Sequence, residues 1–533
     1  MVMIDNNTSQ NINNGRLSDS NKKIKKFWEK IASFFKIIFV GNTLPQFFLH
    51  LYLIIILISS ILLWRPFSRT SNVSINFIQA LFIACSGFSN TGLTPIPINE
   101  YLSVWGKIIL LFDMEIGCLG ATVVFFCLWI FVRKKFDRNY KENPLILNLL
   151  QSERGGTKLS STYKIVSISM ILIICIQLFF TLIYSLIFFF FPAYNQILDP
   201  NTNISYNSSE LLPQYHNFGL SLWIGLFTSV SAMGNAGFEI ISNTSIAPYR
   251  NDWGTILQIL LILELTIGGL GPVVIFDVFE KIRMRRKNLN YNITLFAKIC
   301  FTTYFLISII TISLSFTSEI LNTTSYIWTC DNSHHEFGYA VIYNKCMCLI
   351  YNVLDTRCLG MSSINCMALT ETTKWIYTIS MFIGGSPAST AGGIRTTTIA
   401  IIFITLFSKI RGYENITISH HKIEHETIKD ALIVFFTAQI MIIIGVFVVW
   451  TSIPKNLQNN YPITDIVFEV MSAFGTVGLD LGITKTIQWW GLVYLILLMF
   501  IGQLGVLASI TFSARKNPRY GDLDYPVETI KIA

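Results

Sequence analysis

One short pattern recurs inside the long apolar runs of this chain and limits what it can fold into. The pattern Ile-Gly-x-Leu-Gly occurs at 116–120, 267–271 and 501–505, and a fourth Ile-Gly pair begins at Ile383. Small residues let transmembrane helices pack closely, which would explain glycines in such runs. It would not explain three copies of one pattern, so we expect a repeated structural unit.

Each copy follows an earlier glycine at a nearly constant distance. These earlier glycines lie in "SNTGLTP", "GNAGFE", "RCLGMS" and "FGTVGLD", and the intervals to the Ile-Gly glycines at 117, 268, 384 and 502 are 25, 31, 24 and 24 residues. Apolar spans precede them at about 46–64, 163–191, 293–316 and 428–450. The sequence therefore predicts four tandem units, each a span, a short re-entrant helix, a glycine loop and a second span.

Composition indicates that these units lie in a membrane. Of the 533 residues, 52% are hydrophobic and only 13% are charged, whereas soluble proteins carry nearly twice that charged fraction. Several apolar runs reach the roughly 20 residues that a helix needs to cross a bilayer. We predict an all-α polytopic membrane protein with four helix–pore loop–helix repeats, and hence eight transmembrane helices, around a central pore.

The distribution of charge sets the expected topology. The net charge of +8 comes largely from clusters such as 133–141 and 281–287, whereas 193–220 contains no Lys or Arg. This is the positive-inside pattern, so we expect a plasma-membrane protein with both termini in the cytoplasm, in contact with lipid and not with nucleic acid. The expected parts are an N-terminal tail (1–45), repeats at 46–135, 160–287, 291–412 and 425–514, and a C-terminal tail (515–533).

The four glycine loops are the candidate functional site. Non-helical backbone at membrane depth is tolerated only where it lines water or is buried in protein. Glycine reaches positive φ without steric cost, so that successive carbonyls can point at one axis as in potassium channels, and the short helices would direct their negative ends towards a dehydrated cation. The expected K⁺ selectivity-filter residues are Thr91, Gly92, Asn235, Ala236, Gly237, Leu359, Gly360, Val477 and Gly478.

Charged residues near these loops have expected supporting roles. Glu239 and Asp480 each follow a loop glycine by two positions and would concentrate cations at the outer mouth. Arg357 is a cation beside a proposed cation filter. We expect it to brace the third loop, either by pairing with Asp355 or by pointing away from the axis.

The stretch "GGSPASTAGGIRT" interrupts the sixth span with residues of poor helix propensity. A kinked packing helix is one interpretation. The functional interpretation is a mobile gate below the filter with a membrane-embedded arginine near its cytoplasmic end. The expected gate residues are Gly384, Gly385, Ser386, Pro387, Ala388, Ser389, Thr390, Ala391, Gly392, Gly393 and Arg395.

On these residues the chain resembles the Trk/Ktr/HKT superfamily of K⁺ transporters and, within it, the bacterial Ktr-type membrane subunit. The resemblance runs from about residue 45 to the end and rests on the four loops, on "GGSPASTAGGIRTTT" and on the final "YPVETIKIA". It implies a homodimer with one pore per subunit, a gate in the third repeat and a separate cytoplasmic ring of nucleotide-binding Ktr/RCK regulatory subunits. Glycine at the first filter position implies K⁺ over Na⁺.

Some residues depart from the family pattern. The third loop reads "TRCLGM" where relatives usually have a Thr-Arg-Thr-Ala-Gly-Phe type sequence, and Gln503, below the filter, stands where relatives often carry an arginine cation. The insertion at 322–345 has no recognised counterpart. Its Cys330, His334 and His335 fit exposed loop residues better than a metal site, and a disulfide from Cys330 to Cys346 or Cys348 is left open.

The expected function is K⁺ uptake driven by ion gradients, because the sequence contains no GxxxxGK[ST] phosphate loop. K⁺ is the transported ion, Na⁺ as a coupling ion is left open, and no covalent cofactor is expected. The alternative is a Trk-type or Na⁺-permeable transporter of the same superfamily. An enzyme is not expected, because Asp113 and Glu115 face different sides of a helix and Glu264 alone makes no acid–base pair.

Overall fold

A computed structural model gives the fold of most of the chain. It describes residues 44–71, 73–120, 159–198, 205–242, 244–322, 325–329, 341–387, 389–413, 416–418 and 421–506. The chain divides into one unit of 1–55 with 511–533 and a second unit of 56–510. Of the first unit, the structure describes only 44–55, the start of a helix. The two tails, the basic cluster at 133–141 and the terminal "YPVETIKIA" lie outside the described residues.

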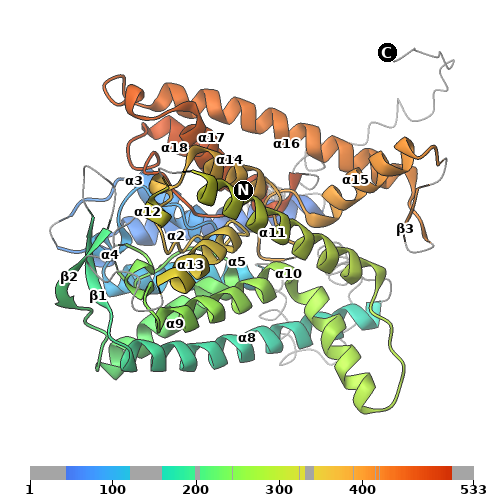
Figure 1. The fold of residues 1–533 in the computed structure, drawn as a ribbon, viewed down its shortest axis with the longest axis horizontal. Coiled ribbons are helices and arrows are strands. Elements are labelled where there is room, and N and C mark those ends of the chain that lie inside the picture. The colour runs from blue at the N-terminus through green and yellow to red at the C-terminus, as the bar shows by residue number, and fades with distance from the viewer. Residues whose placement is uncertain are drawn as a thin grey trace, which may run out of the picture. The chain divides into compact units, whose positions relative to one another are not determined.

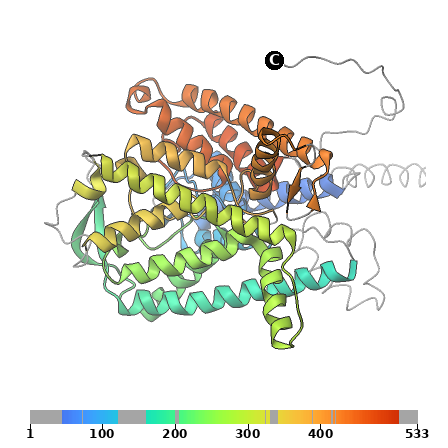
Figure 2. The ribbon, with the colours of Figure 1, turned by 45° about the vertical axis from the view of Figure 1, so that its right-hand side comes forward.

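The helices that open the four units agree with the apolar spans expected from the sequence. They are α2 (Leu44–Trp64), α8 (Leu159–Phe190), α11 (Leu295–Leu321) and α16 (His425–Ser452). By length and composition, four of the described helices could each cross a membrane: 168–190 of α8, α10 (Gly254–Arg286), α11 and α16. In Figures 1 and 2, α8 and α16 run along opposite margins with α10 and α11 between them.

Four shorter helices precede the glycine loops. They are α3 (Phe77–Phe88), α9 (Phe218–Gly234), α13 (Val341–Asp355) and α17 (Ile463–Gly475). The final turns of all four are buried, as expected for helices that end inside the protein and not at its surface. A capping box between Asn76 and Gln79 starts α3, and the Asn217 side chain caps α9. The expected short helix before each loop is therefore present.

The second helices of the units show what the Ile-Gly-x-Leu-Gly pattern does. Helix α5 (Val104–Leu119) ends at Gly120 with φ 80°, and α18 (Trp489–Leu504) ends at Gly505 with φ 92°. Helix α10 is broken at Gly271, with φ 79° and Pro272 directly after it. The last glycine of each copy thus ends or breaks a helix, with a positive φ that residues with a side chain rarely adopt. In the third unit the break is wider and separates α14 (Glu371–Phe382) from α15 (Thr396–Ile410).

Helix α16 shows how these helices divide their faces. Ala438, Ile442 and Val449 are buried and join the core cluster formed with α17 and α18. Phe436 and Phe447 on the same helix are 60% and 68% exposed. A helix that exposes large apolar side chains on its outer face is suited to lipid.

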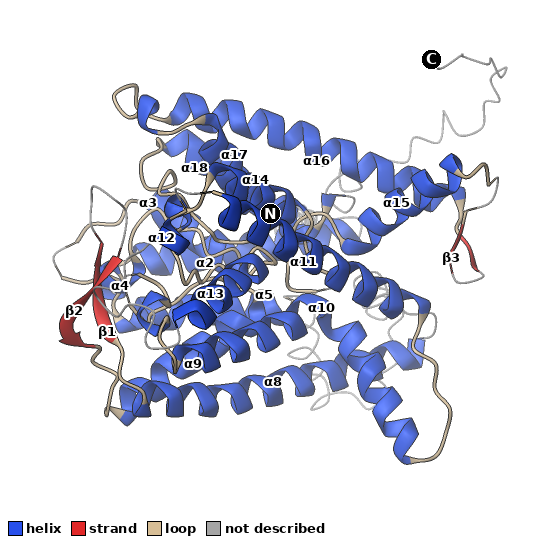
Figure 3. Ribbon diagram, viewed as in Figure 1, coloured by secondary structure: helices blue, strands red, loops and turns tan. Residues whose placement is uncertain are grey.

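Two hairpins were not predicted by the all-α interpretation. Strands β1 (Tyr194–Leu198) and β2 (Ser205–Leu211) pair antiparallel, with Tyr194 opposite Leu211, inside the loop without basic residues. A smaller hairpin joins β3 (Thr417–Ile418) to β4 (His421–Lys422). Figure 3 shows them as the strands of an otherwise helical unit. The remaining short elements are η1 (Pro66–Ser68), α4 (Ile98–Tyr101), η3 (Ala247–Tyr249), α12 (Tyr326–Thr329), η5 (Cys366–Ala368) and η6 (Gln458–Asn460).

Candidate functional site

The four loop glycines form a closed ring. A β-carbon built on Gly92 would lie 2.8 Å from the Cα of Gly237, and one built on Gly237 would lie 3.1 Å from the Cα of Gly360. One built on Gly360 would lie 3.2 Å from the Cα of Gly478, and one on Gly478 would lie 3.2 Å from the Cα of Gly92. The structure therefore brings together loops from all four units around one centre.

Backbone carbonyls alternate with these glycines. The β-carbon positions of Gly92, Gly237 and Gly360 lie 2.8, 2.9 and 2.5 Å from the carbonyl oxygens of Ala236, Leu359 and Val477, and that of Gly478 meets the oxygen of Thr91. All four glycines have positive φ, between 73° and 92°. Because any side chain there would overlap the next loop, only glycine fits the ring. Within the described part of the chain, none of these four oxygens accepts a hydrogen bond.

The residue two positions before each loop glycine is also left-handed. Asn90, Asn235, Cys358 and Thr476 have φ values of 52°, 58°, 78° and 50°. Positive φ is uncommon outside glycine, so its recurrence at one position in four loops marks a shared backbone turn. We refer to these four residues as the turn residues. Of them, only Asn235 was among the filter residues expected from the sequence.

Three of the turns close in the same way. The amides of Thr91, Ala236 and Val477 donate to the carbonyls of Ser86, Ser231 and Ser472, at 2.9, 2.8 and 2.9 Å. Such a bond between residues five apart is typical of a helix that ends in a left-handed residue. The third loop differs, because the backbone amide of Leu359 donates to the backbone carbonyl of Asp355, four residues back. In the other three loops a serine stands six positions before the glycine, a signal in the sequence that the prediction did not use.

Of the two arrangements expected for Arg357, the pairing with Asp355 is wrong. The Arg357 guanidinium, 1% exposed, donates to the carbonyls of Ile383 and Gly384 at 2.6 and 3.0 Å and lies 4.8 Å from the Tyr304 ring centroid. Asp355 accepts from the amide of Met361 at 3.1 Å. The two side chains therefore bind different segments: Asp355 holds the residue after Gly360, and Arg357 reaches the stretch after α14.

That stretch, residues 383–395, is not a kinked helix. Its ends pair with each other, because Gly384 donates to Ile394 at 2.9 Å and Ile394 donates to Phe382 at 3.2 Å. We call it the crossing segment; residue 388 lies outside the described residues. It packs against the break in α10, where Ser386 donates to the carbonyl of Gly269 at 3.0 Å. The helical alternative is thereby excluded for the described part of the segment.

Arg395, at the far end of the crossing segment, lies beside Gln503. The Arg395 guanidinium donates to the carbonyl of Ala391 and to that of Gln503, the latter at 2.9 Å. We expected the glutamine to remove a cation from this place. The Gln503 side chain carries no charge, and the guanidinium of Arg395 lies against the backbone of residue 503; the effect of the glutamine itself stays a prediction.

The carboxylates expected at the outer mouth differ in their contacts. Glu239 accepts from the amide of Ile241 at 3.2 Å. Asp480 pairs with Lys485 at 3.3 Å, and their side chains are 35% and 49% exposed. The Asp480 carboxylate raises the pKa of Lys485. Lys485 was not singled out from the sequence, and it partly offsets the charge of Asp480.

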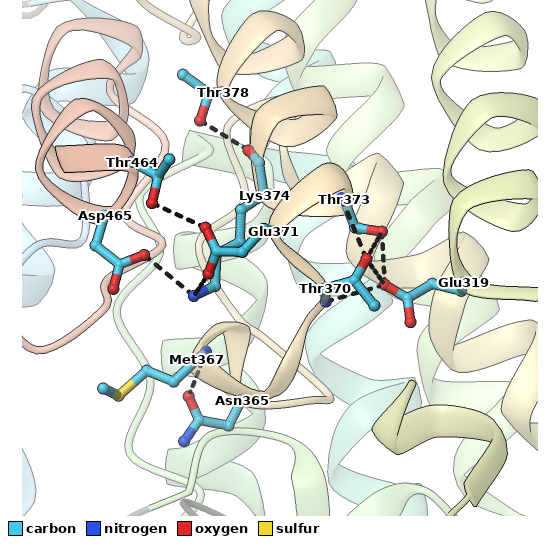
Figure 4. A network of polar contacts seen from close by, with 10 residues as sticks. All are labelled: Glu319, Asn365, Met367, Thr370, Glu371, Thr373, Lys374, Thr378, Thr464 and Asp465. Carbon is cyan, nitrogen blue, oxygen red and sulfur yellow. Dashed lines mark hydrogen bonds and ion pairs between the residues drawn. The ribbon is translucent and has the colours of Figure 1, made fainter. Parts of the chain in front are cut away.

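A polar network, buried except for Glu371, fixes the start of α17, as Figure 4 shows. Lys374 of α14 pairs with Glu371 at 3.0 Å and with Asp465 of α17 at 3.1 Å. Beside it, Glu319 at the end of α11 accepts from Thr370 and Thr373 of α14. The network ties three elements of the third and fourth units together, and its charges were not predicted to meet.

Three further carboxylates within the helices have structural partners. Asp113 accepts from Ser59, Glu115 accepts from Gln177 at 2.9 Å, and Glu264 accepts from Tyr184 at 2.8 Å and Ser229 at 2.7 Å. No group of three metal-ligating side chains occurs within the described ranges. Cys330, His334 and His335 lie outside them, so the metal interpretation of that insertion stays a prediction. Cys346 and Cys348, the two partners considered for Cys330, are free cysteines, which argues against the disulfide.

A ring of loops enclosed by membrane-length helices defines an integral membrane transport protein. The family described as "TrkH: Cation transport protein" matches residues 47–520, so the chain belongs to this family. It is a multi-pass cation transporter of the Trk/Ktr group and not an enzyme.

Individual relatives support the same assignment over most of the chain. The "Uncharacterized cation transporter MG322 homolog" of Mycoplasma pneumoniae is 32% identical over 94% of this chain and 98% of the relative. The "Ktr system potassium uptake protein D" of Bacillus subtilis is 28% identical over 90% and 95%. The crystal structure of the potassium transporter TrkH from Vibrio parahaemolyticus matches with a TM-score of 0.58 at 15% identity, covering 91% of each chain, which shows a shared fold.

Proposed function

We propose that this protein takes up K⁺ across the plasma membrane through the ring of four loops. The observation that carries the proposal is the closed ring itself, in which four carbonyl oxygens without hydrogen-bond donors in the described chain alternate with four glycines. Buried carbonyls need a partner, and a dehydrated monovalent cation supplies one, as in other carbonyl filters. Helices α3, α9, α13 and α17 end at the ring. The negative ends of their dipoles would further stabilise a cation there.

The crossing segment is the proposed gate, and ion gradients are the proposed driving force. Its glycines and its non-helical backbone allow it to move without unwinding a helix. Arg395, bound to backbone at the end of the segment, would hold the closed position. The other gate residues keep this role as proposals, and of them Ala388 lies outside the described residues.

The proposed assembly follows from the likeness to a Ktr subunit. It is a homodimer with both termini in the cytoplasm, controlled by a ring of nucleotide-binding Ktr/RCK chains. Co-purification of the full chain with such a ring, and a nucleotide-dependent change in uptake, would test this part of the proposal. Uptake that is the same with and without the ring would contradict it.

The test of transport is rescue of a host that lacks K⁺ uptake, grown at low external K⁺. Gly478→Ser should abolish the preference for K⁺ over Na⁺, because its β-carbon would overlap the Thr91 carbonyl. Gly482→Ser is the matched control, since Gly482 also has positive φ, 79°, but has nothing within 4 Å. Rescue that Gly478→Ser leaves unchanged would refute the filter assignment.

A further inference from the structure

The crossing segment contacts the glycine loops at specific residues. Two of the four turn residues, Asn235 and Thr476, accept a hydrogen bond directly from the segment. Their loops, the second and the fourth, are not adjacent in the ring. The segment is also bound by the third loop through Arg357. It is therefore bonded to three loops and not simply placed beside them.

The contact with the second loop is a side-chain pair. The hydroxyl of Thr390 donates to Oδ1 of Asn235 at 2.9 Å, and both residues are buried. The side-chain nitrogen Nδ2 of Asn235 donates to the backbone carbonyl of Arg357 at 3.4 Å. Asn235 thus joins the second loop, the third loop and the segment. Its left-handed backbone places Ala236 and Gly237 directly after this anchor.

The contact with the fourth loop uses the segment's backbone. The amide of Gly392 donates to Oγ1 of Thr476 at 2.8 Å. The approach is close, because a β-carbon on Gly392 would lie 2.5 Å from two atoms of the Thr476 side chain. Thr476 directly precedes Val477 and Gly478, so the segment holds the turn from which the ring carbonyl of this loop projects.

The first loop is different. Its turn residue, Asn90, is fully buried, and neither atom of its side-chain amide has a hydrogen-bond partner among the described residues. Of the four loops, the second, third and fourth share described hydrogen bonds with the crossing segment. The crossing segment is therefore bonded to three of the four loops, and no described bond joins it to the first.

We propose that Thr390 and Thr476 are positioning residues through which the crossing segment sets the geometry of the second and fourth loops, so that its displacement lowers the discrimination between K⁺ and Na⁺. This inference rests on the proposed filter and deepens it. Breaking either bond leaves a buried polar atom unpaired, which frees the loop to relax. Since coupling between two sites is reciprocal, K⁺ in the ring also stabilises the bonded position of the segment.

Matched substitutions separate the hydroxyl from the shape of the side chain. Thr390→Val and Thr476→Val keep the branched shape and remove the hydroxyl, whereas Thr390→Ser and Thr476→Ser keep the hydroxyl. Thr378→Val is a control for the exchange itself, because Thr378 is also buried but its hydroxyl binds its own helix at Lys374. Each variant is made in the full chain and purified in lipid nanodiscs.

The readout is the stabilisation of each variant by KCl and by NaCl, from which apparent affinities follow. Both valine variants should lose about fivefold in K⁺ affinity, the size expected from one neutral hydrogen bond, with a smaller change for Na⁺. The serine variants and Thr378→Val should keep the wild-type ratio of K⁺ to Na⁺ affinity. A loss of fold alone would lower the unfolding temperature without moving this ratio.

The inference is overturned if both valine variants keep the wild-type ratio, or if Thr378→Val shifts it equally. The two positions are independent, so one misfolded variant still leaves a test at the other. Failure of the proposed function looks different: the wild-type chain would then show no preference for K⁺ over Na⁺ and no rescue of K⁺ uptake.

Discussion

Replacing Arg357 with lysine would test whether the third loop depends on the shape of a guanidinium as well as on its charge. The Arg357 fork donates to two carbonyls, of Ile383 and Gly384, at 2.6 and 3.0 Å. A lysine ammonium is a point charge on a flexible stem and does not reproduce this planar fork. Arg357→Lys should therefore keep one bond and lose the other.

The magnitude follows from the count of bonds. A hydrogen bond to a charged group contributes about 1.5–3 kcal/mol, so Arg357→Lys should lower the free energy of unfolding by about that amount. Arg357→Ala loses both bonds and leaves two buried carbonyls unpaired, which gives about 3–6 kcal/mol. The expected order of stability is wild type, then lysine, then alanine.

The assay is denaturant unfolding of the purified protein in buffer without K⁺, so that ion binding does not add to stability. Arg357→Lys as stable as the wild type would refute the fork argument. The double variant Arg357→Ala with Asp355→Asn adds a second check. Since the two side chains bind different partners, their effects should add within about 0.5 kcal/mol. A larger coupling energy would indicate that Arg357 and Asp355 interact directly after all.

Three further predictions concern the network of Figure 4, the crossing segment and the outer mouth. Lys374→Met leaves Asp465, 7% exposed at its side chain, without its cation, and should cost about 3–5 kcal/mol of unfolding free energy; a loss under about 1 kcal/mol in denaturant unfolding would contradict a buried pair. Gly392→Ala puts a β-carbon against Thr476 and should raise K⁺ flux into vesicles, whereas Gly412→Ala, with nothing within 4 Å, should not; equal fluxes would count against a gate at this place. Lys485→Gln frees Asp480 and should lower the K⁺ concentration for half-maximal uptake, an effect that salt weakens; no change at low ionic strength would show that Asp480 does not attract K⁺.

The four loop glycines could be predicted from the sequence because each position in the ring can be occupied by only one residue type. No other residue combines positive φ with the absence of a β-carbon, so Gly92 and Gly478 mark their loops without reference to the surrounding letters. The spans were predicted for a similar reason, since lipid demands long apolar helices. Helix α16 agrees with its expected span to within three residues at each end.

The partners of side chains were not predictable in the same way. Asp355 was one expected partner of Arg357, but Asp355 accepts from Met361 and Arg357 donates to residues that follow α14. The contacts of Asn235 with Thr390 and of Thr476 with Gly392 join residues 155 and 84 positions apart. Such pairs follow from how units pack together, which no local pattern records. The serine six positions before the glycine in three of the loops is visible in the sequence. It becomes apparent only when the repeats are aligned on their loop glycines.

The ring is made by one chain, and this sets how its pore can change over time. In a channel of four identical subunits, symmetry repeats each substitution four times around the axis. Here Cys358 occupies one turn, Thr476 another and asparagine two more, so each quarter of the pore mutates alone. In the third unit the helix break is widened into the crossing segment, next to Gly271, where a β-carbon would meet Ser389 at 2.9 Å. A substitution in that segment changes one quarter of the pore and leaves the sequence of the other three as it is.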